Sequence, residues 1–371
     1  MQNQNLITKN AMQELTQAKS SFAAKKKADA LGIFNSIPMP KEKEEDWRYT
    51  KIDALKIESF DLNPTTKIFA SALSEDLIEK GIILTDINSA LEKYPIAQQY
   101  FFKNTEIGKD KFVALSAAHF SNGIFLYVPK NVELEEPIRV NFEGNGILHN
   151  LVIVEPNSKL DFIEEYSGND ESEQLNACVT EVFASQNSKI NFHHINSWTK
   201  NASNFTNIIG AVERDASINF ISGCFGGKIN RLRIDTLFNG TGSQCNNINT
   251  TNEVLVDGIL KDESSSVYRG LIKIEKQAQK TWSYLQNHIL KLGEKTLANS
   301  IPSLKIDAND VKASHGATVG QINDEHMFYL MARGLSREEA EKLIVEGFFE
   351  PVIQKIPSEE LREKIRKMVR G

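Results

Sequence analysis

An echo of nearly constant length in the middle of the chain limits most strongly what the chain can fold into. The hexapeptide NSKLDF at 157–162 returns as NSKINF at 187–192 and as DASINF at 215–220. The second copy begins 30 residues after the first, and the third begins 28 residues after the second. A weaker fourth copy, GSQC at 242–245, follows after another 27 residues. Self-similarity at this period indicates stacked supersecondary units of one kind.

The segments around the echo are of β type. Between about residues 114 and 319, short runs rich in Val, Ile, Phe and Thr alternate with Gly, Asn, Ser and Asp, and helical periodicity is lacking. A turn made of short strands cannot bury its own apolar face, so we expect a β-solenoid whose turns pack on one another. A β-sandwich is the alternative, but it does not explain the near-constant spacing. The recurring positions should form two inward ladders along the axis, one of Leu160, Ile190, Ile218 and Cys245, the other of Phe162, Phe192 and Phe220.

Helical patterns flank this β region, so the sequence predicts three parts: an N-terminal helical region at 1–113, a β core at 114–319 and a C-terminal helical region at 320–371. Good helix formers fill residues 10–31, and two prolines follow. We interpret Trp47 as a core or interface anchor. Near the C-terminus, Asn323 or Asp324 can cap one helix, and Ser336 with Glu339 forms a capping box for the next.

Composition narrows the function classes. A net charge of −6 and a pI of about 5.8 give no basic field that would attract nucleic acid or anionic lipid. No apolar run approaches the roughly 20 residues of a membrane span, and the N-terminus lacks a secretory pattern. We therefore expect a cytoplasmic protein. Cys178, Cys224 and Cys245 are widely spaced and contain no CxxC pair, so we interpret them as buried small apolar residues.

Two apparent motifs have simpler explanations. His193 and His194 are adjacent, and neighbouring residues of a strand point to opposite faces, so they cannot chelate one ion. We expect one of them to be buried and the other exposed. The glycine-rich run at 222–227 is followed by neither GKS nor GKT, and a solenoid corner or β-bulge explains it better than a phosphate loop.

The most specific pattern lies at residues 310–353. SHGAT at 314–318 reads as a polar turn with one histidine, and it leads directly into two patterned helices. This stretch resembles the C-terminal part of the SufB/SufD family, the scaffold proteins of the Suf iron–sulfur cluster assembly system, and WRYT at 47–50 resembles the entry segment of that family. The SHGAT form is similar to the SufD branch, because SufB members carry a glutamate on each side of the equivalent histidine.

The resemblance implies a mainly β fold, with a right-handed parallel β-helix core between helical regions. It also implies a scaffold and not an enzyme. Such a chain would pair with a SufB-like scaffold and bind a SufC-like ATPase, which supplies the ATP hydrolysis that this chain has no Walker A sequence to perform. Iron or a nascent cluster would be held only transiently in the complex, without a stably bound cofactor on this chain alone.

The resemblance assigns roles to particular residues. His315 would lie at the junction with SufB as a cluster-assembly residue and metal ligand, a role that suits imidazole. The C-terminal helices would dock SufC, which makes Phe348 and Phe349 candidate anchors, with one ring expected to face outward. The candidate polar residues around these anchors are Glu325, Arg333, Arg337 and Glu338.

Two departures from the family pattern concern sulfur. Some SufD proteins carry a cysteine two residues before the histidine, where this chain has Ala313. SufB carries its cluster-building cysteine nine residues before the histidine, where this chain has Ile306. These positions predict a subunit that assists assembly while its partner carries the sulfur chemistry.

Two other functions are compatible with a solenoid. One is a carbohydrate-active β-helix enzyme, a lyase or esterase, which would need clustered acidic and basic residues on one face. The other is a free-standing homodimer that handles iron, which would share every feature described above.

Overall fold

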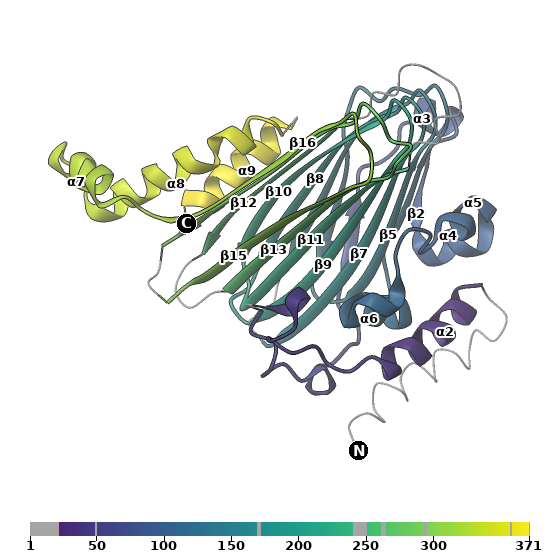
Figure 1. Ribbon diagram of the computed structural model, residues 1–371, viewed down its shortest axis with the longest axis horizontal. Coiled ribbons are helices and arrows are strands. Elements are labelled where there is room, and N and C mark those ends of the chain that lie inside the picture. The colour runs from purple at the N-terminus through teal and green to yellow at the C-terminus, as the bar shows by residue number, and fades with distance from the viewer. Residues whose placement is uncertain are drawn as a thin grey trace.

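The computed structural model describes residues 22–48, 50–168, 172–239, 251–260, 265–292, 295–356 and 358–370, with the backbone alone for 251–260 and 368–370. In this part of the chain, two parallel sheets form a long solenoid, with helices beside its two ends (Figure 1). The predicted mainly β solenoid between helical regions is confirmed. The boundaries drawn at 113 and 319 stay predictions. Across these residues, no helix combines the length and apolarity that a bilayer crossing requires.

Each turn of the solenoid contributes one strand to each of two eight-stranded sheets. All neighbours within a sheet are parallel except the pairs β1–β4 and β2–β3. Sheet A follows the order β1 (Lys67–Ala70), β4 (Ile138–Glu143), β6 (Lys159–Ser167), β8 (Lys189–Trp198), β10 (Ser217–Gly226), β12 (Thr251–Leu260), β14 (Trp282–Lys291) and β16 (Lys312–Gln321). Sheet B follows the order β2 (Ile83–Asp86), β3 (Ile124–Val128), β5 (Ile147–Val154), β7 (Gln174–Ala184), β9 (Ala202–Val212), β11 (Ile229–Phe238), β13 (Ser265–Ile274) and β15 (Leu297–Ile306).

The first residue of each echo copy turns the corner between the two sheets. Asn157, Asn187 and Asp215 have φ values of 60°, 58° and 58°, the left-handed region that Asn and Asp tolerate better than other side chains. The Asn187 side-chain amide also donates a hydrogen bond of 2.8 Å to the side-chain oxygen of Asn157. The sequence echo therefore arises in part because each turn needs a residue that tolerates the left-handed backbone conformation at this corner.

The two predicted ladders are present in the first three copies. Ile190 lies in register between Leu160 and Ile218, and all three are fully buried. The Phe192 ring lies 5.4 Å from Phe162 and 5.5 Å from Phe220, centroid to centroid.

The predicted fourth position of the first ladder is wrong. Ile218 pairs with Asn252 of β12, so Cys245 does not continue the ladder, and Cys245 itself lies outside the described residues. The weak fourth copy of the echo thus precedes the strand that stacks on β10. The glycine-rich run at 222–227 ends at a corner between β10 and β11, where Gly226 and Gly227 have φ values of 69° and 89°.

Most of the N-terminal region packs on the outer face of sheet B, whereas Leu77 of its second helix contacts the inner core of the solenoid. Its helices are α2 (Phe22–Ser36), α3 (Glu75–Glu79), α4 (Ile87–Lys93), α5 (Pro95–Tyr100) and α6 (Lys111–His119), with single 3-10 turns at Glu45–Trp47, Ile57–Ser59 and Ile107–Lys109. Trp47 is buried in the core, where its ring lies 5.3 Å from Phe112 and 6.1 Å from Phe205. The guanidinium of Arg231, a fully buried residue of β11, stacks 4.0 Å from the Trp47 ring. Trp47 thus joins the entry segment to the solenoid.

Three C-terminal helices follow the last strand: α7 (Asp324–Ala332), α8 (Arg337–Ile353) and α9 (Glu359–Arg370). The predicted caps are confirmed, since Asn323 accepts hydrogen bonds from the first turn of α7 and Ser336 with Glu339 forms the capping box of α8. Helices α8 and α9 lie on the outer face of sheet A, while α7 projects away from the solenoid (Figure 1). An apolar cluster lies between sheet A and the two helices α8 and α9. It contains Ile163, Ile195 and Leu290 from the sheet and Val345, Phe349, Ile353, Ile356, Leu361 and Ile365 from the helical end.

The phenylalanine ladder makes a prediction about stability. Replacing Phe192 with Ala should lower the free energy of unfolding by about 3–5 kcal/mol. The substitution would leave a cavity between the Phe162 and Phe220 rings, and the neighbouring strands hold these rings too far apart to fill it. Chemical denaturation followed by circular dichroism measures this change. Phe69→Ala, at a residue with 51% exposure on β1, is the matched control and should cost far less. Equal losses in the two variants would contradict the ladder.

Candidate functional site

The last turn of the solenoid has two open edges. β15 and β16 stand at the ends of their sheets, and within the described residues no further strand pairs with either of them. Large apolar side chains are exposed around this end: Leu297 (43%), Ile306 (38%), Val319 (43%) and Trp282 (44%). Unpaired strand edges with exposed apolar residues are templates for another chain. We call β15, β16 and these four residues the open end.

His315 lies in the middle of β16 and not in a turn, so the predicted polar turn is wrong. β16 pairs with β14 along its whole length, and that parallel ladder extends a segment whose Ser, Gly and Thr content is typical of a loop. His315 is in register with Leu285, a fully buried core residue. Paired residues of neighbouring parallel strands share a face. His315 therefore belongs to the inward row of sheet A, and it is exposed because no further turn covers it.

The inward rows of the last turn also carry two apolar residues, Ala313 on β16 and Ile306 on β15. Ala313 is in register with the buried Ser283, and Ile306 is in register with the buried Ile274. The two positions where the family carries cysteines therefore also belong to the open end, without a thiol. Among the described residues, no group of three or more His, Cys, Asp and Glu side chains is arranged to hold a metal ion.

A second exposed surface lies on α7 and the start of α8. Phe328 is 75% exposed, Tyr329 57% and Met331 42%, and Leu343 of α8 is 49% exposed. The Arg333 guanidinium donates a hydrogen bond of 2.9 Å to the Tyr329 hydroxyl and stacks 4.9 Å from its ring. This apolar and aromatic surface projects beyond the solenoid, where a partner can reach it.

The predicted partner-binding residues divide between two locations. Glu325, Arg333 and Arg337 are exposed on α7 and at the start of α8, beside the exposed aromatic pair. Phe349 is buried against Phe225, at 5.2 Å between ring centroids, and Phe348 is half-buried beside it. Neither of these two rings is fully exposed, and their role in partner binding stays a prediction.

Phe328 and Tyr329 were not among the predicted residues. The helical spacing of the sequence could have predicted that Phe328 and Tyr329 are exposed. Met327 and Leu330 mark the inner face of α7, and residues one and two positions after Met327 must point away from that face.

A polar cluster lies inside the solenoid. The Glu164 carboxylate accepts a hydrogen bond of 2.7 Å from His194 Nδ1 and one of 3.1 Å from the Tyr166 hydroxyl. The Asn150 amide donates to the same carboxylate at 3.3 Å. All four residues are buried, so the carboxylate is held by donors in place of water. This cluster is a satisfied network that fixes the facing strands.

His193 points the other way, toward the face on which α8 packs, where its register neighbour Ile221 contacts Val352. The expectation that one of the paired histidines is exposed is wrong, because helices α8 and α9 cover the outer face of the sheet and bury His193 completely. Neither ring nitrogen of His193 has a hydrogen-bond partner among the described residues. Burial lowers the pKa of His193 to about 4.

The described cysteines are inward-facing and unreactive. Cys178 is buried beside the Tyr166 hydroxyl, at 3.3 Å, and burial raises the pKa of its thiol to about 12. Cys224 is half-buried, and loss of solvation likewise raises the pKa of its thiol to about 12. Neither side chain is a thiolate near neutral pH, so both agree with the interpretation as packing residues.

Comparison with known proteins connects these features to one family. The family model described as "SUF system FeS cluster assembly, SufBD core domain" matches residues 140–251 and 245–348. The model described as "SufBD protein N-terminal region" matches residues 65–140. The matched stretches include nearly all of the solenoid, the open end and most of α8.

Curated relatives of this chain belong to the same family. The iron–sulfur cluster assembly protein SufD of Bacillus subtilis is 31% identical, over an alignment that covers 79% of this chain and 74% of that protein. Iron–sulfur cluster assembly SufBD family proteins of Staphylococcus saprophyticus and Staphylococcus epidermidis are each 27% identical, covering 77% of this chain and 68% of theirs.

Burial of a neutral His193 predicts acid sensitivity. The folded-state pKa of about 4 lies below the ordinary value of 6.5, so the unfolded state binds the proton first as the pH falls. Stability from this group is complete above pH 6.5 and is lost as the pH falls toward 4, by about 3 kcal/mol in all.

His193→Leu should remove this loss, so that chemical denaturation at pH 7 and at pH 4.5 differs less in the variant than in the unchanged protein. His326→Leu is the control, because His326 is exposed on α7. Identical pH dependence in the His193 variant and the unchanged protein would refute the assignment.

Proposed function

This chain belongs to the SufBD family of iron–sulfur cluster assembly proteins, and from that membership we propose that it is a scaffold subunit of a Suf assembly complex. The observation that carries the proposal is the open end, a solenoid terminus with two unpaired strand edges and an exposed histidine. In this role the chain positions partners and cargo and performs no reaction of its own. Iron, sulfur and the nascent cluster are cargo, and no stably bound cofactor is assigned to the chain.

The partner that fits the open end is a related solenoid, a SufB-like scaffold. Main-chain N–H and C=O groups of β15 and β16 can continue their sheets into the strands of a second chain. Ile306 and Val319 would then be covered by the same kind of inward row that covers their register partners Ile274 and Ile289. A related chain offers matching strand spacing and a matching apolar interior.

His315 would face the seam between the two scaffolds. Its imidazole can ligate iron or accept a proton there, while Ala313 and Ile306 leave the thiolate ligands to the partner. Burial at the seam would exclude water from a nascent cluster. This division of labour follows from the side chains present at the open end.

The projecting surface on α7 and α8 would receive a SufC-like ATPase. Exposed aromatic residues flanked by charge are typical binding anchors, and Phe328 with Tyr329 supplies the aromatic part. ATP-driven closure of the ATPase subunits would move the two scaffolds against each other and open the seam. The complex would work in the cytoplasm, without nucleic acid or membrane as partner.

Purification from the native cell tests the complex. A tagged chain should bring down an ABC-type ATPase and a larger homologous scaffold. Val319→Lys, which places a charge on the inward row of the open end, should lose the scaffold and keep the ATPase. Recovery of the tagged chain only with copies of itself would favour a homodimer that handles iron and would refute the complex.

Replacing His315 with Ala should impair formation of the iron–sulfur cluster while leaving the protein complex intact. The side chain is exposed in the single chain, so the variant should fold and should still recover both partners. Cluster formation, followed by visible absorbance and iron content of the purified complex, should fall several-fold or more. Ser314→Ala, at the exposed neighbour of His315 on the outward face of β16, is the matched control. Unchanged cluster yield in the His315 variant would remove that residue from the site.

The ATPase surface has its own test. The double substitution of Phe328 and Tyr329 by Ser should weaken ATPase binding by at least about ten-fold, because central aromatic anchors contribute about 2 kcal/mol or more each. Binding can be measured by biolayer interferometry with the purified ATPase subunit. Phe69→Ser is the matched control, an exposed phenylalanine on β1. Equal affinity of both variants would exclude this surface.

A further inference from the structure

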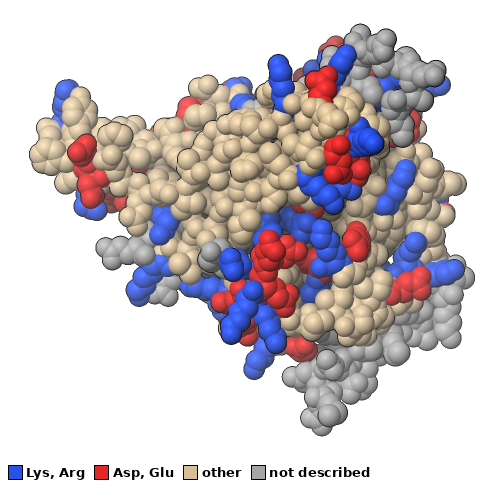
Figure 2. Space-filling view, viewed as in Figure 1, with Lys and Arg blue, Asp and Glu red and all other residues tan. Residues whose placement is uncertain are grey.

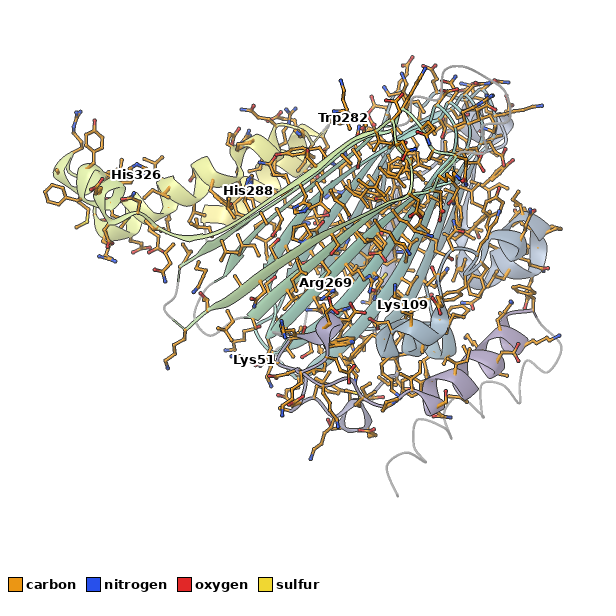
Figure 3. All side chains as sticks on the ribbon, viewed as in Figure 1. Lys51, Lys109, Arg269, Trp282, His288 and His326 are labelled. Carbon is orange, nitrogen blue, oxygen red and sulfur yellow. The ribbon has the colours of Figure 1, made fainter. Side chains whose placement is uncertain are left out.

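A cavity of about 240 Å³ lies on the outer face of sheet B, where its floor includes β13, the strand next to β15. The stretch from Asn104 to Val113 forms one side of the cavity, and strands β9, β11 and β13 form its floor. Figure 2 shows charged side chains of both signs gathered on this face. Figure 3 places Lys109 beside α6, over these strands.

The walls are largely apolar. Ile209 and Leu271 lie on either side of Asp235 in the register of the floor strands, and Leu237 and Val113 also line the cavity. A volume of this size lies below the roughly 300 Å³ at which sites for drug-sized ligands begin. The cavity therefore suits a small metabolite with an apolar body.

Most charges at the cavity are already neutralised within the protein. Asp235 accepts two hydrogen bonds from Arg233 Nε, of 3.0 and 2.9 Å. Asp110 pairs with the buried Arg231 at 3.3 Å. Lys273 pairs with Glu275 beyond the cavity. These pairs leave little net charge in the floor.

Asn207 and Lys109 carry donors that have no partner among the described residues. The Nδ2 amide group of Asn207 has no hydrogen-bond partner although Asn207 is only 3% exposed, and a buried orphan donor costs about 1–3 kcal/mol. Lys109 also lines the cavity and forms no ion pair in the described structure. The remaining acid, Glu106, is exposed to solvent, which screens its repulsion of an anion.

We propose that this cavity binds a small amphipathic carboxylate. The carboxylate accepts hydrogen bonds from Asn207 Nδ2 and Lys109, and the apolar body packs on Ile209, Leu237 and Leu271. A ligand at this place bridges α6 and three strands of sheet B, so it ties the N-terminal region to the solenoid. The proposal is independent of the role of the open end.

Isothermal titration calorimetry of the full chain with hexanoate tests the site, and hexanol serves as the uncharged probe of the same length. Hexanoate should bind more tightly than hexanol. Lys109→Gln should weaken hexanoate by about ten-fold and leave hexanol unchanged, because it removes a charge and no apolar wall. Lys103→Gln is the matched control, a lysine of the same loop that contacts Tyr100 and does not line the cavity.

A second variant fills the cavity. Leu271 is half-buried, so Leu271→Phe should fold normally, which its denaturation midpoint checks, and should abolish binding of both probes. The proposal is overturned if hexanoate shows no binding at millimolar concentration, or if Lys109→Gln binds it as tightly as the unchanged protein does. Retained hexanoate affinity in Leu271→Phe would equally overturn it.

Discussion

The parallel, in-register stacking of one turn on the next is the constraint on which the rest of this structure depends. A single turn carries apolar residues on its inner side and has nothing of its own to cover their edges. Burial of Phe192 depends on Phe162 in the turn before and Phe220 in the turn after. The corners must therefore recur at fixed places, and left-handed Asn157, Asn187 and Asp215 hold them there. Stability is thus shared between neighbours, and the last turn necessarily lacks half of its contacts.

The same register determines what the last turn presents. His315 continues an inward row whose previous member, Leu285, is sealed in the core. In earlier turns the same register position is occupied by Phe192 and Phe220, and the next strand covers both rings. At the terminus His315 is exposed, yet its direction is fixed by the ladder to β14. A rigid strand thus positions the side chain more firmly than a turn would, which agrees with the role proposed for His315.

The echo made the solenoid and its first ladders predictable, because NSKLDF and its copies combine a corner residue with inward Leu or Ile and Phe. The turn around His315 was mispredicted for the converse reason: SHGAT has loop composition, and only pairing with a distant strand makes it extended. The sequence also did not indicate which of Phe348 and Phe349 is covered, since docking of α8 on sheet A buries Phe349 and leaves Phe348 half-buried. Local sequence patterns predicted most helices, strands and helix caps. The direction and exposure of individual side chains depended on tertiary contacts, which such patterns do not contain.

The two ends of the solenoid differ in a way that bears on function. At the beginning, β1 and β2 are antiparallel strands of four residues each, a short edge of the kind that limits unwanted pairing. At the end, β15 and β16 are ten residues each and parallel to their neighbours, with apolar residues exposed beside them. An exposed edge of this length is an aggregation liability unless another chain covers it. Protection of one end and exposure of the other therefore support the proposed strand pairing at the last turn and not at the first.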